Sequence, residues 1–129
     1  MKTKYTILTA TIAGFALGAI AVQALHAQAK PAAYGIAEVT ISNQDGYSKE
    51  FLPAVRKTIA DAGGKFLAAG GKTESMTGTP PAPRVVIIQW PNLDAADAWW
   101  NAAATKDAFK IGEKYATLRT FAVEGLPAQ

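Results

Sequence analysis

The sequence contains no cysteine, and His26 is the one histidine among its 129 residues. Without cysteine there is no disulfide framework, no thiolate metal site and no thiol nucleophile. Charged residues make up only 18% of the chain while half of it is apolar, a composition that excludes an intrinsically disordered protein. This length suits one domain of ordinary size.

Residues 1–29 differ in composition from the rest of the chain. Lys2 and Lys4 form a short positive start, and residues 5–22 then run without a charge. The segment closes on Ala27-Gln28-Ala29, the small-x-small pattern that signal peptidase accepts. We therefore expect a signal peptide that is cleaved after Ala29, which would place the protein in the periplasm or outside the cell.

An uncleaved membrane anchor is the alternative interpretation of this segment. The 18 uncharged residues of 5–22 reach the lower limit for a helix that spans a bilayer. Gly14 and Gly18 form a GxxxG pair that could dimerise such a helix. In that case the protein would be anchored in the inner membrane; a contact with the membrane is expected only if the segment is kept.

Residues 30–129, the domain that remains, lack histidine as well as cysteine. This inventory excludes a Ser-His-Asp triad, a histidine zinc site and a His-ligated haem. The domain keeps 11 basic and 10 acidic residues, a net charge of +1, without a basic stripe that interleaves with aromatics, so no nucleic-acid partner is expected. Its carboxylates show no metal-binding spacing, and we expect neither a metal nor a cofactor.

Periodicity predicts four strands in this domain. Residues 34–41 are rich in β-forming residues and partly apolar on both sides, so we expect both of their faces to be covered. The apolar run 84–90 is typical of a central strand that is covered on both sides, and residues 118–125 alternate again as the last strand. Residues 66–69 form a short strand that could extend to Thr77. The proline-rich stretch 79–83 is a loop.

Helical spacing of apolar residues predicts a helix from Tyr47 to Ala62, with Asn43 or Asp45 as its cap and Gly63-Gly64 as its end. Pro53 should kink this helix or begin its second half. A second helix follows Pro91-Asn92, and a further helical piece leads to the last strand. The expected inner residues of these two helices are Leu93, Ala96, Trp99, Trp100, Ala103, Ala108, Ile111 and Tyr115.

The order βαββαβ predicts a ferredoxin-like α+β fold, an antiparallel sheet with helices on one face. Alternation puts Tyr34, Ile36 and Glu38 on the other face, together with one side of residues 85–90. An exposed apolar sheet face is unusual in a monomer of this size. We therefore expect a homodimer with two-fold symmetry whose sheets face each other, a dimeric α+β barrel.

Five segments resemble, in order, the domain-of-unknown-function 1330 family. They are Pro31-Ala-Ala-Tyr-Gly-Ile-Ala-Glu38, Gly63-Gly-Lys-Phe-Leu-Ala-Ala-Gly-Gly71, Arg84-Val-Val-Ile-Ile-Gln-Trp-Pro91, Ala95-Ala-Asp-Ala-Trp99 and Val123-Glu-Gly125. The resemblance spans nearly all of residues 30–129 and implies the dimeric α+β barrel. It implies a fold rather than an activity. Residues 101–105 depart from the family, which usually has a Ser-Pro-x-Tyr-like stretch there.

Glu38 is the candidate acid of the domain. On a face that is hidden in a dimer, partial desolvation would raise its pKa and suit acid–base chemistry. The alternative is structural: a salt bridge from Glu38 to Arg84 or to Arg119. Trp90 or Trp100 could line a cavity, although aromatic rings at such positions usually supply buried area.

Two classes of function remain open. The first is a dimer that binds a small apolar or aromatic molecule, or that serves as an interaction module, with candidate ligand-binding residues Tyr34, Glu38, Trp90, Trp100 and Asn101. The second is a cofactor-independent enzyme, monooxygenase- or isomerase-like as in similar barrels, that uses the barrel interior with Glu38, Tyr34 and Arg119 as candidate catalytic residues. The absence of histidine, the commonest general base, favours binding.

Overall fold

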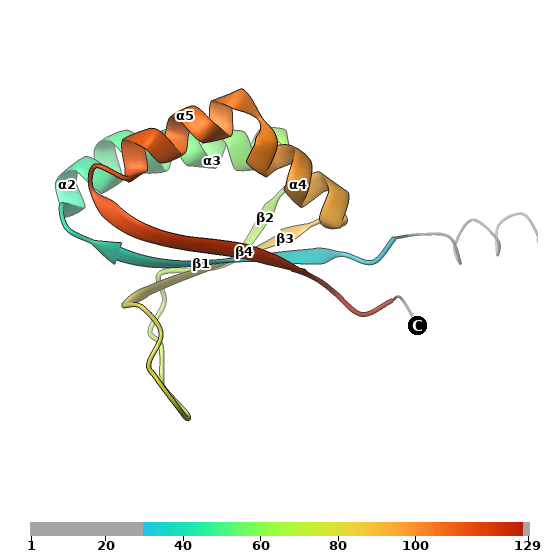
Figure 1. The fold of residues 1–129 in the computed structure, drawn as a ribbon, viewed down its shortest axis with the longest axis horizontal. Helices are drawn as coiled ribbons and strands as arrows, with labels where there is room; N and C mark the ends of the chain where they lie inside the picture. Colours follow the sequence, from blue (N-terminus) through green and yellow to red (C-terminus); the bar gives the residue numbers. More distant parts are fainter. Residues whose placement is uncertain (1–29, 128–129) are drawn as a thin grey trace, which may run out of the picture. The chain divides into compact units, whose positions relative to one another are not determined.

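A four-stranded antiparallel sheet is the frame of the domain in the computed structural model, which describes residues 30–127 (Figure 1). The predicted signal peptide, residues 1–29, lies outside the described residues. The strands stand in the order β2-β3-β1-β4, so that β1 and β3 are central. Their bounds are Ala33–Ile41 for β1, Lys65–Ala69 for β2, Arg84–Trp90 for β3 and Ala116–Glu124 for β4.

The helices all cover the same face of this sheet (Figure 1). A first helical segment consists of α2 (Gln44–Gly46), the π-helical turn η1 (Tyr47–Phe51) and α3 (Leu52–Asp61), and a second of α4 (Leu93–Asn101) and α5 (Ala103–Gly112). The architecture is the predicted ferredoxin-like α+β fold. Within the described residues, no helix is long and apolar enough to cross a membrane.

Residues next to one another in the chain explain where the first helical segment begins and where its π-helical turn lies. The side chain of Asn43 accepts a hydrogen bond from the backbone N–H of Gly46 at 3.0 Å, which confirms one of the two predicted caps. Pro53 has no N–H to give to the carbonyl four residues earlier, and the helix takes its π-helical turn just before it. This turn contains Tyr47 and Phe51, both of them buried.

Glycine ends the first helical segment, as predicted. Gly63 has a φ of +85°, and the N–H of Gly64 donates to the carbonyl of Ile59 at 2.9 Å. A side chain at Gly64 would lie within 2.9 Å of both Ile59 and the ring of Trp90. The backbone at Gly64, which leads into β2, therefore packs directly against Ile59 and Trp90 of the core.

Strand β2 is shorter than the longest extent predicted for it. It ends at Ala69 and does not continue to Thr77, because Gly70, with a φ of +75°, turns the chain and the prolines between 80 and 83 have no N–H for pairing. Residues 70–83, which we call the arm, project from the sheet on the side away from the helices (Figure 1). Met76 within it is 85% exposed.

In the second helical segment, the buried residues are not all those that were expected to face inward. The chain is extended at Ala102, with φ −68° and ψ 141°, so that α4 and α5 are separate helices. Trp99 is buried, whereas Trp100 is 39% exposed and Ala103 is exposed. Tyr115 follows the end of α5.

The sheet has one covered face and one open face. Strand alternation places Ala33, Val39, Val86, Ile88 and Trp90 under the helices, where they are buried. The open face carries apolar side chains on three strands: Tyr34, Ile36, Val85, Ile87, Phe121 and Val123. Phe121 is 44% exposed and Val123 51%, which confirms the predicted exposed apolar face.

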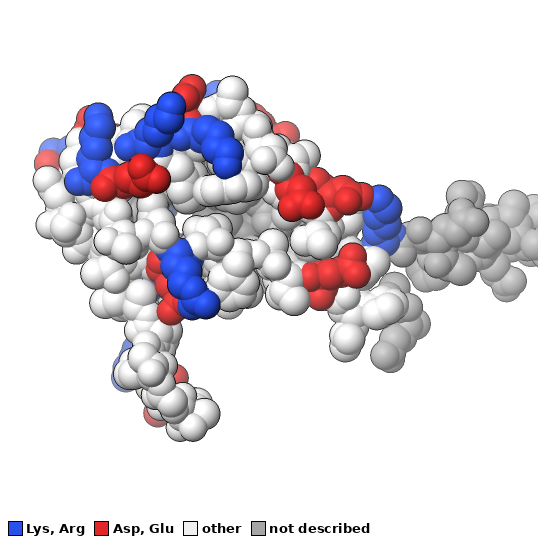
Figure 2. Space-filling model, in the orientation of Figure 1, with Lys and Arg blue, Asp and Glu red and all other residues white. Residues whose placement is uncertain are grey.

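Charged side chains gather over the helices, where Lys and Arg are interleaved with Asp and Glu (Figure 2). Lys49 pairs with Asp45 at 3.1 Å and Lys57 with Asp61 at 2.7 Å, each pair one turn apart on its helix. These pairs are largely exposed, so each contributes little to stability. The helical layer therefore has a mixed, solvated outer surface.

Candidate functional site

A cavity of about 630 Å³ lies between the sheet and the helices. At the Trp90 end, the central strand β1 turns only the small residues Ala33, Gly35 and Ala37 toward the helices, which leaves space between the sheet and the helices. On β4, the corresponding residues are Thr120 and Ala122. Small residues that stand side by side on neighbouring strands leave the space that larger side chains would fill.

Aromatic rings from the helices form the roof of the cavity. Tyr47 and Phe51 come from the π-helical turn, with ring centroids 5.2 Å apart, and Phe109 of α5 meets Phe51 edge-on at 5.6 Å. Trp99 of α4 continues the cluster, 5.9 Å from Phe109. The two contacts of Phe109 have the edge-to-face arrangement that aromatic rings favour, so the four rings form one packed cluster.

Trp90 closes one end of the cavity. Its ring lies 5.0 Å from that of Trp99, and only 1% of its surface is exposed. A Cβ at Gly35 would lie 3.0 Å from the indole nitrogen of Trp90, so the bare backbone of β1 makes room for this ring.

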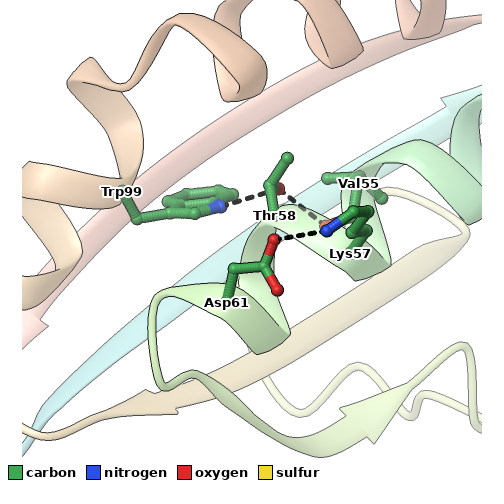
Figure 3. A network of polar contacts seen from close by, with 5 residues as sticks. All are labelled: Val55, Lys57, Thr58, Asp61 and Trp99. Atoms are coloured by element: carbon green, nitrogen blue, oxygen red, sulfur yellow. Dashed lines mark hydrogen bonds and ion pairs between the residues drawn. The ribbon is translucent and has the colours of Figure 1, made fainter.

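A polar contact joins the two helical segments above this end. The indole N–H of Trp99 donates to Thr58 Oγ1 at 3.0 Å, and that hydroxyl donates to the carbonyl of Val55 at 2.7 Å (Figure 3). The Lys57–Asp61 pair lies beside this network, on the exposed side of α3 (Figure 3). The contact fixes Trp99 above the sheet and holds α4 against α3.

Arg84 lies at the other end of the cavity. It is the first residue of β3, faces the helices, and has its guanidinium carbon 5.7 Å from the ring centre of Tyr47. Its Nε atom is buried without a hydrogen-bond partner in residues 30–127. Thr120 Oγ1, also at the cavity, is buried and unpartnered within the same range.

A second hollow of about 470 Å³ adjoins the cavity under α5. Trp100, Phe109, Leu118 and Thr120 border both spaces. Trp100 is held there by an edge-on contact with Phe109 at 5.0 Å and by Lys106, whose Nζ lies 3.7 Å from the ring centre. The cavity thus reaches toward the edge strand β4.

The residues predicted for the site do not come together. Trp90 and Trp100 line the cavity, but Tyr34, Glu38 and Arg119 lie on the open face of the sheet. The sixth, Asn101, is exposed at the end of α4, where its side chain donates to the carbonyl of Asp97 at 2.9 Å. These assignments stay predictions. The cavity lies within one copy of the domain, whereas Tyr34, Glu38 and Arg119 lie on the opposite, open face of its sheet.

Glu38 has the structural role that the sequence left as the alternative to acid–base chemistry. Its carboxylate forms an ion pair with Arg119 on the neighbouring strand and accepts a hydrogen bond from the backbone N–H of Ala82 at 3.1 Å. Arg84 cannot be its partner because it faces the opposite side of the sheet. The hydrogen bond from Ala82 and the Arg119 charge hold the pKa of Glu38 below its ordinary value in a single copy of the domain, the opposite direction to the rise expected on a face hidden in a dimer.

We expect this ion pair to make stability depend on pH in the acid range. Because the pKa of folded Glu38 is lower than the ordinary 4.5, its contribution is complete above that value and is lost as the pH falls through the lowered pKa. Urea unfolding of wild type and Glu38→Gln should show a difference in midpoint at about pH 7 that shrinks below about pH 4. A difference that stays constant over this range would contradict the assignment.

Sequence reasoning missed the cavity residues Tyr47, Phe51 and Arg84 as a group. The helical pattern marked Tyr47 and Phe51 as buried residues, but a stripe does not show which buried rings face empty space. The signal that could have found Arg84 is alternation, because it places this cation on the same side of β3 as Val86 and Trp90. Within residues 30–127, no group of histidine, cysteine and acidic side chains could hold a metal ion.

Comparison with known families finds a match over most of residues 30–129. The model described as "Domain of unknown function (DUF1330)" matches residues 32–126. Comparison with the curated proteins finds no match.

Several solved structures are similar to the fold. A protein of unknown function from Rhodopseudomonas palustris, RPA0582, has a TM-score of 0.60 at 15% identity, over 75% of this chain and 84% of that one. SnoaB, a cofactor-independent oxygenase from Streptomyces nogalater, has a TM-score of 0.54 at 10% identity, over 76% and 96%. A protein from Bacteroides fragilis described as dimeric and ferredoxin-like has a TM-score of 0.47 at 12% identity, over 73% and 96%. At these identities the similarity establishes the fold alone.

Proposed function

The chain belongs to the DUF1330 family, whose members share a domain of unknown function, and we propose that it binds a small apolar or aromatic molecule in the cavity between its sheet and its helices. The observation that carries this proposal is the cavity itself, with its volume of about 630 Å³ and its aromatic roof. Ligand sites in proteins commonly have volumes of about 300–1,000 Å³ and apolar walls.

The energetics of packing support an occupant. Protein interiors are normally close-packed, and apolar walls that face a space instead of neighbouring atoms lose contacts. The small residues Gly35 and Ala37 on the helical face of β1 leave that space beneath the aromatic rings. A ligand that fills it would recover the lost contacts, which is the physical basis of its affinity.

The proposal is tested with N-phenyl-1-naphthylamine, a neutral three-ring probe that fluoresces in apolar sites. We expect wild type to bind it and Val86→Phe, which puts a ring into the cavity floor, to bind at least about 10-fold more weakly. Ala98→Phe, on the exposed side of α4, adds the same ring outside the cavity and should leave the affinity unchanged. Absence of binding, or equal affinity for Val86→Phe with an unchanged melting temperature, would overturn the proposal.

A cofactor-independent enzyme in the same cavity is the second candidate. The similarity of its fold to an oxygenase of that kind supports it. Against it, the ionisable side chains that line the cavity are Arg56, Arg84, Asp97 and Tyr47, without a histidine to act as a general base. Mass spectrometry of a bound ligand after incubation in air distinguishes the two candidates. An unchanged ligand supports binding, and an oxygenated product supports the enzyme.

We also propose that the domain forms a two-fold homodimer through the open face of its sheet. Its apolar side chains, which include Phe121 and Val123, are left in water by the fold of a single copy. A second copy is the simplest cover because the same surface then serves both partners. Sedimentation equilibrium of residues 30–129 should give twice the mass of one chain, and a monomer at micromolar concentration would refute this.

We propose the cellular location of the protein, outside the cytoplasm, from the sequence alone. The composition of residues 1–29 supports export with cleavage after Ala29. Mass spectrometry of the exported protein should show a chain that starts at Lys30, whereas a chain that retains Met1 would support the membrane anchor.

A further inference from the structure

Arg84 is a cation without a counter-ion at the end of an apolar cavity. Its Nε atom is buried and makes no hydrogen bond, and none of the ion pairs within residues 30–127 includes it. Glu38, the acid that sequence analysis offered as its partner, lies on the opposite face of the sheet and pairs with Arg119. A partly buried guanidinium without a partner is unfavourable, and a bound anion relieves this cost.

The surroundings hold this guanidinium in one place. Its carbon lies 5.7 Å from the ring centre of Tyr47, a cation–π contact. On the other side, Nη1 lies against the backbone of Gly70, where a Cβ would approach it to 2.1 Å. Because Gly70 also has a φ of +75°, the turn that ends β2 supplies both the bend and the space.

The two ends of the cavity have different chemistry. Trp90 and Trp99 form an aromatic end, and Arg84 over Tyr47 forms a cationic end. Arg84 and Trp90 are the first and last residues of β3, about 20 Å apart along an extended strand. Asp97, the acid among the lining residues, belongs to α4, the helix that carries Trp99 at the aromatic end.

We propose that the ligand of this cavity is an elongated amphiphile with an aromatic or apolar body and one carboxylate, which pairs with Arg84. This inference rests on the proposed function and names the class of its ligand. The apolar body lies against the Trp90 end, away from water. The carboxylate accepts charge-assisted hydrogen bonds from the guanidinium, including the unpartnered Nε–H.

The test compares 12-phenyldodecanoate with its neutral amide as competitors of N-phenyl-1-naphthylamine, at a pH well above the pKa of a carboxylic acid. Wild type should prefer the acid by about 10- to 100-fold, the range of one hydrogen bond to a charged group. Arg84→Gln should lose the preference, and Arg84→Lys, which keeps the charge but not the planar fork, should retain part of it. Lys110→Gln is the control, because it removes an exposed cation of α5 that does not line the cavity, and it should keep the full preference.

The outcomes separate this inference from the function on which it rests. If the probe binds and acid and amide displace it equally from wild type, the carboxylate inference fails and the apolar site stands. If Arg84→Gln, melting as wild type does, keeps the preference, Arg84 is not the anion partner and the inference fails. If neither probe nor competitors bind wild type, both proposals fail.

Discussion

Replacement of Trp90 by alanine is expected to lower the free energy of unfolding by about 3–5 kcal/mol. In a domain of this size, such a loss lowers the melting temperature by more than about 10 °C. Because total stabilities of such domains are about 5–15 kcal/mol, the variant should be only marginally folded.

The size of this effect follows from how closely Trp90 is packed. Its ring lies against Trp99 at 5.0 Å, and hypothetical side chains at Gly35 and Gly64 would approach it to 3.0 and 2.8 Å. Two backbone segments thus come close to the indole because they carry no Cβ. Truncation would merge the space of the ring with the existing cavity, and the surrounding backbone cannot collapse into a void of that size.

Thermal and urea unfolding measure the effect, with Trp100→Ala as the control. Trp100 is the adjacent tryptophan but is 39% exposed, and its loss should cost about 1–2 kcal/mol. Trp90→Phe should fall between wild type and Trp90→Ala because it keeps part of the ring. Equal losses for the two alanine variants would show that Trp90 does not have the central packing role assigned to it.

The second large effect is expected on assembly. Ile36→Lys should weaken the proposed homodimer by at least about 100-fold, which corresponds to about 2.7 kcal/mol. Ile36 lies at the middle of the open face, opposite Ile87 on β3 and Phe121 on β4. Two-fold symmetry brings two copies of each substitution into one interface, so the cost of burying the charge is incurred twice.

Sedimentation velocity over a range of concentrations measures the dissociation. Thr40→Lys is the matched control, since it introduces the same charge on the same strand and face at an exposed position near the strand end. This variant should remain dimeric. If Ile36→Lys dimerises as wild type does, the copies associate through a different surface.

A second variant of the open face, Ile87→Lys, separates assembly from ligand binding. Ile87 lies opposite Ile36 on the same face of the sheet but is not among the residues that line the cavity, so monomeric Ile87→Lys should still bind N-phenyl-1-naphthylamine with the affinity of wild type. The sequence had placed the candidate pocket in the shared interior of the dimer. Loss of binding on dissociation would support that earlier expectation.

Local chemistry made much of the fold predictable. Asn43, Asn92 and Gly63 mark helix ends through capping and positive φ, and the structure has helices that begin and end there. The apolar run of β3 predicted a central strand, and the alternation of β1 separated the residues under the helices from those on the open face. Helix ends and strand faces depend on neighbours in the chain, which a single sequence displays.

The end of β2, where the arm begins, and the partner of Glu38 could not be predicted from local sequence alone. Whether β2 passes Gly70 depends on pairing across a hairpin with three prolines, and a strand pattern alone left this open. Arg84 and Arg119 were equal partners for Glu38 until the register of β1 with both neighbouring strands assigned them to opposite faces.

By itself, the sequence of this protein determined which chemistry residues 30–129 can hold and which elements they form, because composition and periodicity are properties of the chain. Only the tertiary structure decided where a ligand could go. The cavity exists because Gly35 and Ala37 of β1 stand beside small residues of β4 under a roof of rings from η1, α4 and α5. That coincidence depends on strand register and helix placement, which bring together residues far apart in the chain.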